Sequence, residues 1–252
     1  MKYNWNWGIF WDPAPDGTGM YLWWLVSGLG WTLATALLAW AIALALGATV
    51  GTLRTTPLPW VVRLGNAYVE FFRNIPLLVQ MFLWYFVLPE LLPKALGDAM
   101  KQIVPPWGSF WPAVLCLAFY TSARVAEQVR AGIQSLPRGQ SMAGTALGLT
   151  LPQSYRHVLL PQAFRIILPP LTSEFMNIIK NSAVALTIGL VELTARARSM
   201  QEFTFQVFEA FTAATLIYIL ITLVVAFGMR WVEKRVQVPG LISAGGAPLA
   251  RH

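Results

Sequence analysis

The pattern of apolar residues predicts an all-helical protein that crosses a membrane five times. The first apolar run, from Met20 to Leu53, contains no charged residue. As a helix it would reach about 50 Å, at ~1.5 Å per residue, which exceeds the ~30 Å hydrocarbon core of a bilayer. Charged or proline-rich segments separate this run from the later ones. The expected spans are 20–53, 61–88 (with an approach helix at its start), 109–134, 165–189 and 207–230.

A polar segment at residues 139–161 interrupts this pattern between the third and fourth spans. It reads GQSMAGTALGLTLPQSYRHVLLP, with small residues first and an aliphatic ending. Ala143, Gly144 and Gly148 would let side chains of another protein approach the backbone closely. If the segment is helical and cytoplasmic, it is a docking surface rather than a span. The loop that carries it is expected to cover 135–164.

The composition supports a membrane protein. Of the 252 residues, 56% are hydrophobic and 12% are charged, and this charged share is about half that of soluble proteins. The net charge of +7 is scattered over loops rather than gathered into a run, so we expect no nucleic acid partner. The single cysteine, Cys116, is expected to be a small packing residue. The N-terminal stretch lacks the apolar core and cleavage site of a signal peptide.

The positions of Lys and Arg predict the orientation. If the polar segment is cytoplasmic, eleven Lys and Arg residues lie inside and five outside. This asymmetry places the N-terminus outside and the C-terminus inside. The chain then divides into a periplasmic segment 1–19, a transmembrane domain 20–234 and a disordered cytoplasmic tail 235–252, which is rich in Gly, Ala and Pro. A chain of this size is expected to form half of a dimeric pore.

No constellation for catalysis is visible. His157 lies in the polar segment and His252 ends the chain, and neither has a nucleophile and a carboxylate arranged around it. No GxxxxGK(S/T) motif is present to cradle a nucleotide. We therefore expect a translocation subunit without a cofactor of its own, rather than an enzyme. If ATP drives transport, a partner ATPase binds the ATP and Mg²⁺.

Charges within the spans are the strongest site candidates, because a charge at mid-bilayer costs at least ~2.5–3.5 kcal/mol. In the third span Arg124, Glu127 and Arg130 recur every three residues and share one helix face. Glu127 either forms a structural salt bridge with Arg124 or Arg130 or contributes to a site. Arg124 is favoured as a functional cation, since a guanidinium can receive a carboxylate through two parallel hydrogen bonds. Arg130 is expected to set orientation.

The fourth span carries a polar stripe at spacings of three and four residues. Its members are Ser173, Glu174, Asn177, Lys180, Asn181 and Ser182. The stripe either forms interhelical hydrogen bonds or lines a site. In the second case Lys180, Asn181 and Ser182 are the substrate-binding candidates, and Glu174 neutralises a cation.

Gln80 is a further substrate-binding candidate in the second span. It follows Pro76, which removes an amide donor and loosens a helix turn. The loosened turn can leave carbonyl groups free to line a cavity. Packing alone is an equal alternative for Gln80.

Four motifs, in order along the chain, resemble one family of transporters. FRNIPLLVQ is similar to the FRGTPLLVQ signature of polar amino acid ABC permeases, and AEQVRAGI is similar to their AExxRGGI. LPQAFRIILPPLTSEFMNIIKNSAVAL is similar to their LPQALRxxLPPLxNxFIxLxKxTSL region. The polar segment resembles the coupling loop of ABC importer permeases, which has Glu-Ala-Ala, then Gly, then aliphatic-x-Leu-Pro. The matching positions are Met142, Ala143, Gly144, Gly148, Leu160 and Pro161.

The resemblance implies a five-helix permease of the type I ABC importer fold, with a cytoplasmic coupling helix, in a bacterial inner membrane. It also implies an ATPase dimer, a second permease subunit, identical or sister, and a periplasmic amino acid-binding protein as partners. The sequence is most similar to glutamate/aspartate permeases, which also have Met-Ala-Gly in place of Glu-Ala-Ala. Arg124 would then receive a substrate carboxylate.

Three alternatives remain open at this point. The substrate could be another polar amino acid such as glutamine. An ion-selective pore would also tolerate buried charge, but it needs rings of charge or carbonyl filters and has no use for a small-residue docking loop. A membrane-embedded enzyme would need a paired acid and base, which the sequence does not offer.

Overall fold

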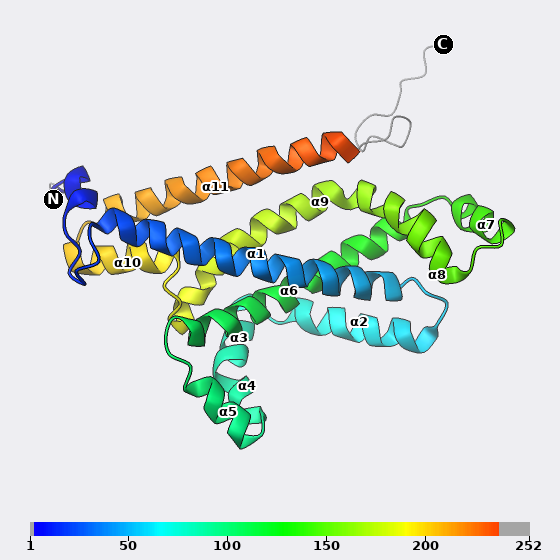
Figure 1. Ribbon diagram of the computed structural model, residues 1–252, viewed down its shortest axis with the longest axis horizontal. Helices are drawn as coiled ribbons and strands as arrows, with labels where there is room; N and C mark the ends of the chain where they lie inside the picture. Colours follow the sequence, from blue (N-terminus) through cyan, green and yellow to red (C-terminus); the bar gives the residue numbers. More distant parts are fainter. Residues whose placement is uncertain (1–2, 237–252) are drawn as a thin grey trace, which may run out of the picture.

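The computed structural model describes residues 3–236, and its long helices follow one axis (Figure 1). The longer helices are α1 (Tyr21–Leu53), α2 (Pro59–Asn74), α6 (Trp107–Gln134), α9 (Leu160–Asn181), α10 (Leu193–Thr204) and α11 (Val207–Val236). The shorter elements are η1 (Trp7–Trp11), α3 (Leu77–Phe82), η2 (Leu83–Val87), α4 (Leu88–Leu91), α5 (Lys94–Lys101), α7 (Arg138–Ala146), α8 (Leu151–Ser154), η3 (Tyr155–Leu159) and η4 (Ser182–Ile188). Apart from one isolated β-bridge, the described residues form helices and loops, so the all-helical prediction is confirmed.

Close packing of α1 against α6 forms the centre of the bundle. A Cβ atom at Gly47 would lie 2.6 Å from the Cβ of Val125, and one at Gly51 would lie 2.6 Å from the carbonyl oxygen of Ala126. Small residues let helix backbones approach this closely inside membranes. One face of α6 is therefore fixed against α1, which leaves the opposite face available for a site.

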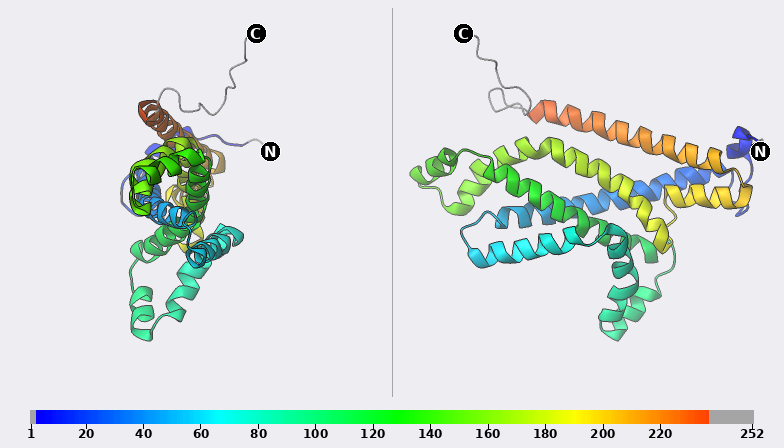
Figure 2. Two further views of the ribbon diagram at one scale, coloured as in Figure 1. Left: turned by 90° about the vertical axis from the view of Figure 1, so that its right-hand side faces the viewer. Right: turned by 180° about the vertical axis from the view of Figure 1, so that it is seen from behind.

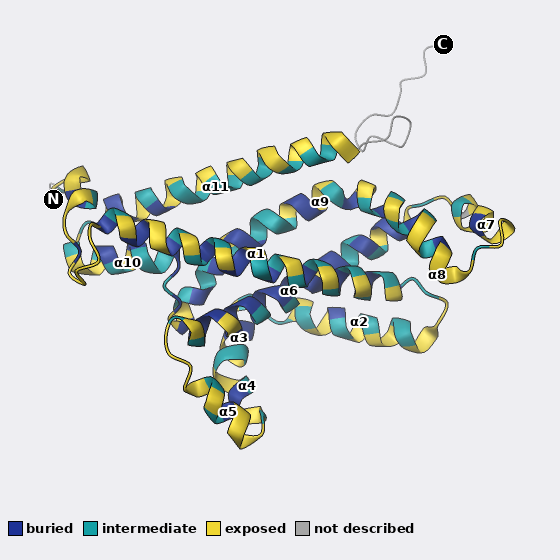
Figure 3. Cartoon of the chain, viewed as in Figure 1, coloured by how far each residue is buried: buried dark blue, intermediate teal, exposed yellow. Residues whose placement is uncertain are grey.

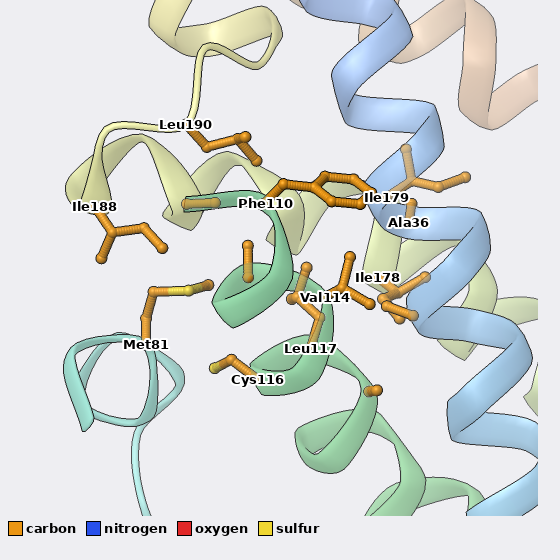
Figure 4. Close-up of a cluster of buried hydrophobic side chains, with 14 residues drawn as sticks. Ala36, Met81, Phe110, Val114, Cys116, Leu117, Ile178, Ile179, Ile188 and Leu190 are labelled. Carbon is orange, nitrogen blue, oxygen red and sulfur yellow. The ribbon is translucent and has the colours of Figure 1, made fainter. Parts of the chain in front are cut away.

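A cluster of buried apolar side chains joins α1, α3, α6, α9 and the chain that follows α9 (Figure 4). Met81, Leu117, Ile178 and Leu190 are fully buried in it. Cys116 lies in the same cluster with its thiol buried, as its isolation in the sequence predicts. The cluster holds the middle of α6 and the end of α9 together, and these are the two segments that carry the intramembrane charges.

The predicted second span, 61–88, is not one rod. α2 ends at Asn74 and the following helical stretch, Leu77–Leu91, is bent from it by 101°. The bend falls at Pro76, which has no amide hydrogen to continue the helix. α3 to α5 then leave the bundle as a lateral arm, residues 77–101 (Figures 1 and 2). α2 corresponds to the predicted approach helix, whereas the apolar run after it lies across the axis of the other helices.

The polar segment 139–161 folds as short helices at one end of the molecule. α7 and α8 are joined by a turn, and a π-helical turn, η3, leads into α9. This end lies opposite the N-terminal segment and α10 (Figure 1). α9 begins at Leu160, before the predicted start at 165, and it tightens into the 3₁₀ helix η4 after Asn181. The segment is therefore helical, as a docking surface requires.

The number of membrane spans depends on the bent helices. α1 and α11 are each long and apolar enough to cross a membrane, and two bent pairs in the described chain could each form one more span. α6, which contains the predicted third span, is not among these helices. α11 continues to Val236, past the predicted boundary at 234, and residues 237–252 of the predicted tail lie outside the described residues.

Candidate functional site

Arg124 lies on the open face of α6, with 44% of its side chain exposed. Its Nη2 atom donates a hydrogen bond of 2.7 Å to the hydroxyl of Tyr120, and its guanidinium carbon lies 4.9 Å from the centre of the Tyr120 ring. Its Nη1 atom lies 4.0 Å from Oε1 of Glu174 on α9. This ion pair is too long for a strong hydrogen bond, so the guanidinium keeps donors free for a ligand.

The polar stripe of α9 faces the same side. Ser173, Asn177 and Lys180 follow at intervals of four and three residues and therefore share one face of the helix. Ser173 and Lys180 are exposed, and Asn177 is partly exposed. Glu174 lies ~100° around the helix from Ser173, at the edge that reaches Arg124. The stripe thus forms an open polar face with Arg124 at one border.

Lys180 contributes to a cavity at the other border of this face. The cavity, of about 300 Å³, is lined by Lys180 and by four residues of α11, which are Thr215, Tyr218, Ile219 and Thr222. Lys180 is six residues beyond Glu174, which corresponds to ~9 Å along the helix axis. The two cations, Arg124 and Lys180, therefore lie at different depths, with Lys180 about 120° around α9 from Glu174. We call this face, bounded by α6 and α11, the polar opening.

Asn181 and Ser182 differ in their placement. Asn181 is half-buried at the end of α9. Ser182 is fully buried, and its hydroxyl donates a hydrogen bond of 2.7 Å to the carbonyl oxygen of Ile179. Lys180 thus lies at the polar opening. Ser182 lies inside the protein and forms a local hydrogen bond, which favours a structural role over substrate binding.

Glu127 is half-buried, and it pairs with two arginines that the sequence pattern did not point to. Nη2 of Arg54 donates a hydrogen bond of 2.7 Å to Oε1 of Glu127, and only 4% of the Arg54 side chain is exposed. Nη1 of Arg73 lies 3.6 Å from the same oxygen. The structural alternative for Glu127 is favoured, but its partners are Arg54 and Arg73 rather than Arg124 or Arg130. This pair ties the end of α1 and α2 to α6.

Gln80 is buried at the bend between α2 and α3. Its Nε2 atom donates hydrogen bonds to the carbonyl oxygens of Phe72, at 2.8 Å, and Ile75, at 2.9 Å. These carbonyls lie at the end of α2, where the bend at Pro76 removes their helical partners. Both amide hydrogens are thus used inside the protein, which favours the packing alternative over a role in binding substrate.

α7 presents an apolar surface at the end of the molecule opposite the N-terminal segment. Most residues of α7 are exposed (Figure 3). Met142 and Ala143 are exposed on it, and Leu147, at the turn that follows, is 80% exposed. Leu160 is half-buried and Pro161 is exposed at the start of α9. An exposed apolar surface of this kind is typical of a protein contact.

Gly144 and Gly148 have internal reasons to be small. Gly144 is buried, and a Cβ atom there would lie 3.0 Å from Oγ of Ser154, so its size lets α7 pack against α8. Gly148 has a φ of +77°, in the left-handed region that glycine adopts without a steric cost. Gly144 is therefore small for packing within the chain, and its contact with a docking partner stays a prediction. Met142, Ala143 and Leu147 form the exposed surface.

Glu192 is a buried acid that the sequence analysis missed. It caps the N-terminus of α10, where its carboxylate accepts hydrogen bonds from the amides of Thr194, at 3.0 Å, and Ala195, at 2.7 Å. It also accepts one of 2.8 Å from the hydroxyl of Tyr218, a residue that lines the cavity beside Lys180. The signal in the sequence was an acid directly before a helix.

The chemistry of the polar opening suits an organic anion. Its two cations donate charge-assisted hydrogen bonds, and Arg124 has the planar geometry that matches a carboxylate. The described residues contain no cluster of three His, Cys, Asp or Glu side chains that could hold a metal ion. Arg124 and Lys180 are the groups that could bind such an anion.

Comparison with known proteins identifies relatives over nearly the whole chain. Residues 43–238 match the family described as binding-protein-dependent transport system inner membrane component. The chain is 51% identical over 241 residues to the glutamate/aspartate import permease protein GltJ of Escherichia coli K12, covering 95% of this chain and 98% of that protein. It is 31% identical to the glutamine transport system permease protein GlnP of the same organism, covering 94% of this chain and all of that protein.

Solved structures show the same fold. A chain of a crystal structure described as an amino acid ABC transporter with histidines superposes with a TM-score of 0.73 at 33% identity, covering 85% of this chain and 95% of that one. A chain of the MetNI methionine ABC transporter superposes with a TM-score of 0.70 at 20% identity, covering 86% and 98%, which supports the fold alone. These matches confirm the predicted type I importer permease fold and a translocation subunit rather than an enzyme. The chain belongs to the family of inner membrane components of binding-protein-dependent transport systems.

Proposed function

We propose that this chain is the permease subunit of an ATP-driven importer and that it translocates acidic amino acids, glutamate and aspartate. The main support for an acidic substrate is the guanidinium of Arg124. It is exposed within an expected span, and it is only loosely paired with Glu174, at 4.0 Å. The greater identity to a glutamate/aspartate permease than to a glutamine permease supports the same substrate.

In this proposal the substrate replaces Glu174 as the partner of Arg124. A loose, partly exposed ion pair contributes only ~0.2–1 kcal/mol, so little is lost when it opens. A carboxylate that accepts two parallel hydrogen bonds from Arg124 gains more, since bonds to charged groups contribute ~1.5–3 kcal/mol. Lys180 offers a second position for a carboxylate farther along the same face. Glutamine has one carboxylate and a neutral amide, so it can satisfy one of the two cations but gains less at the other.

We place the N-terminal segment on the periplasmic side of a bacterial inner membrane and α7 in the cytoplasm. The eleven-to-five asymmetry of Lys and Arg supports this orientation. Five spans then follow, with the bent stretch 59–91 as the second and α6 as the third. The chain is thus a multi-pass protein in contact with membrane lipid, with its C-terminus inside.

The proposed partners follow from the family and from α7. An ATPase dimer, which binds the ATP and Mg²⁺, would dock on the surface formed by Met142, Ala143 and Leu147. α6 enters this end of the molecule and α9 leaves it, so movement of α7 would displace both helices that carry the polar opening. A second permease subunit, identical or sister, and a periplasmic amino acid-binding protein complete the importer.

The substrate proposal is tested by Arg124→Ala in the complete importer in proteoliposomes. We expect loss of aspartate and glutamate uptake, while the complex still assembles and hydrolyses ATP. Arg63→Ala, which removes an exposed arginine of α2, is the matched control and should transport normally. Normal uptake by Arg124→Ala would remove Arg124 from the site. Equal inhibition of aspartate uptake by aspartate and glutamine would favour a glutamine-type importer.

The docking proposal is tested by Ala143→Asp, which places a charge at the centre of the exposed surface of α7. We expect the ATPase to be lost during purification of the complex. Met142→Glu introduces, directly before Ala143, the residue that is typical of the family. This variant should retain the ATPase. Gly148→Trp is a weaker test. Gly148 has a positive φ that would strain any other residue, so the variant could lose the ATPase through local misfolding. Retention of the ATPase by Ala143→Asp would contradict a docking role for this face.

A further inference from the structure

The first described residues form a compact aromatic unit. Residues 3–11, here called the aromatic segment, read YNWNWGIFW and contain five aromatic and no charged residues. The segment lies at the end of the bundle where α1 and α11 begin (Figure 1). These are the two described helices that are long and apolar enough to span a membrane unbent. The aromatic segment therefore lies close to the level at which both helices start.

A buried carboxylate at the start of α11 holds the segment in place. Oε1 of Glu209 accepts a hydrogen bond of 2.8 Å from the amide of Asn6, and its other oxygen accepts one from the hydroxyl of Tyr3. Ile9 is buried in a cluster with Trp24. The segment is thus tied both to α11 and to α1, while Trp5, Trp7 and Trp11 remain exposed.

Those side chains form an exposed surface. Trp5 and Trp7 stack with ring centres 5.9 Å apart, and Trp5 lies 5.6 Å from the ring of Phe208 in the first turn of α11. At least half of the surface of each of these three residues is exposed. Contiguous exposed apolar surface of this kind indicates a partner, because leaving it in water is unfavourable by ~25 cal/mol per Å².

We propose that the aromatic segment and Phe208 form a lipid-binding anchor that lies between the headgroups and acyl chains at the outer end of α1 and α11. Trp is favoured at this depth, because its ring is apolar and its N–H group finds a polar partner. The absence of charge in residues 3–11 fits a lipid interface better than a charged protein surface. Through Glu209 the anchor fixes the start of α11, the helix that borders the polar opening. That the anchor lies in the outer, periplasmic leaflet rests on the topology proposed above.

The test measures the depth of the segment in the complete importer reconstituted into phospholipid vesicles. A nitroxide is attached at Asn4→Cys in a Cys116→Ala background, with partner subunits that lack cysteine. Its collisions with oxygen and with a water-soluble nickel chelate are then compared. We expect the label to favour oxygen over nickel, relative to a label at Pro15→Cys in the exposed loop that follows. The combined Trp5→Ser and Trp7→Ser changes should bring the nickel accessibility at residue 4 up to the value at residue 15.

A matched control removes an exposed aromatic residue elsewhere. Trp60→Ser, at the start of α2 and 64% exposed in the wild-type chain, should leave the depth at residue 4 unchanged. Equal nickel accessibility at residues 4 and 15 in the unaltered segment would overturn the proposal. Protection of the label only after the binding protein is added would also overturn it, in favour of a protein partner. The measurement does not depend on transport, so failure of the acidic-substrate proposal would leave it intact.

Discussion

Two of the arginine–glutamate pairs of α6, Arg54–Glu127 and Arg124–Glu174, differ in length and in the exposure of their arginines. The Arg54–Glu127 pair is short, at 2.7 Å, and Arg54 is almost fully enclosed. The Arg124–Glu174 pair is 4.0 Å long, and nearly half of the Arg124 side chain is exposed. Arg54 also donates a hydrogen bond of 2.8 Å from Nε to Asn66. The first pair is therefore part of the packing of α1, α2 and α6.

The two pairs distinguish a structural charge from a candidate ligand-binding charge, although both lie close together in the sequence of α6. Glu127 and Arg124 are one turn apart on the same helix, yet the first is held by two arginines and the second is left open. A buried charge whose partner is removed is strongly destabilising, whereas an exposed pair contributes little to stability. An open cation inside a span is maintained at a cost in stability, which is expected where it binds a ligand.

The largest expected effect comes from Arg54→Met. Glu127, whose side chain is 33% exposed, would keep only the longer contact with Arg73, so we expect the free energy of unfolding to fall by about 2 kcal/mol, less than for a fully buried pair. The measurement is the thermal stability of the purified complex, followed by loss of the monodisperse peak in size-exclusion chromatography. Arg63→Met, which removes an exposed arginine, is the control. Equal stability of the two variants would remove the distinction between the pairs.

A smaller effect is expected from Arg124→Lys. The charge is retained but the planar fork is lost, which we expect to weaken binding of aspartate about tenfold, equivalent to ~1.4 kcal/mol. Titration calorimetry on the importer complex, without the binding protein, measures this affinity directly. The thermal stability should stay close to that of the wild type. A fall in stability as large as that of Arg54→Met would show that both pairs are structural.

The smallest effect is expected from Glu174→Gln. This change removes the carboxylate that competes with substrate for Arg124, and such pairs contribute ~0.2–1 kcal/mol. We therefore expect aspartate to bind about two- to fivefold more tightly, in the same titration. Ser173→Ala, a neutral change on the neighbouring position of α9, is the control and should leave the affinity unchanged. Weaker binding by Glu174→Gln would mean that Glu174 contacts the substrate rather than screening Arg124.

The sequence predicted the class of fold and several boundaries because these depend on local patterns. The uncharged run from Met20 to Leu53 corresponds to α1, and the start predicted at 207 is that of α11. The polar segment 139–161 was expected to be helical and outside the spans, and the helical part is confirmed. The motifs identified the family, which the comparisons confirm.

Partners distant in sequence could not be predicted in the same way. Glu127 pairs with Arg54, 73 residues away, and only the close approach of α1 to α6 brings the two together. Pro76 decides the role of Gln80, whose amide donates hydrogen bonds to carbonyls of Phe72 and Ile75 that have no helical partner at this bend. The packing role of Gly144 could not be predicted because the sequence does not show that Ser154 packs against it. In each case the missing information was a tertiary contact.

The cap at Glu192 has a consequence for the order in which the chain can mature during synthesis. The amide of Leu193 donates a hydrogen bond of 3.1 Å to Thr32, and Tyr218 completes the coordination of the Glu192 carboxylate. These contacts span the first and last long helices, so α10 cannot reach its final state until residue 218 has been made and inserted. A nascent chain halted before that point leaves the Glu192 carboxylate without its Tyr218 partner in an apolar setting.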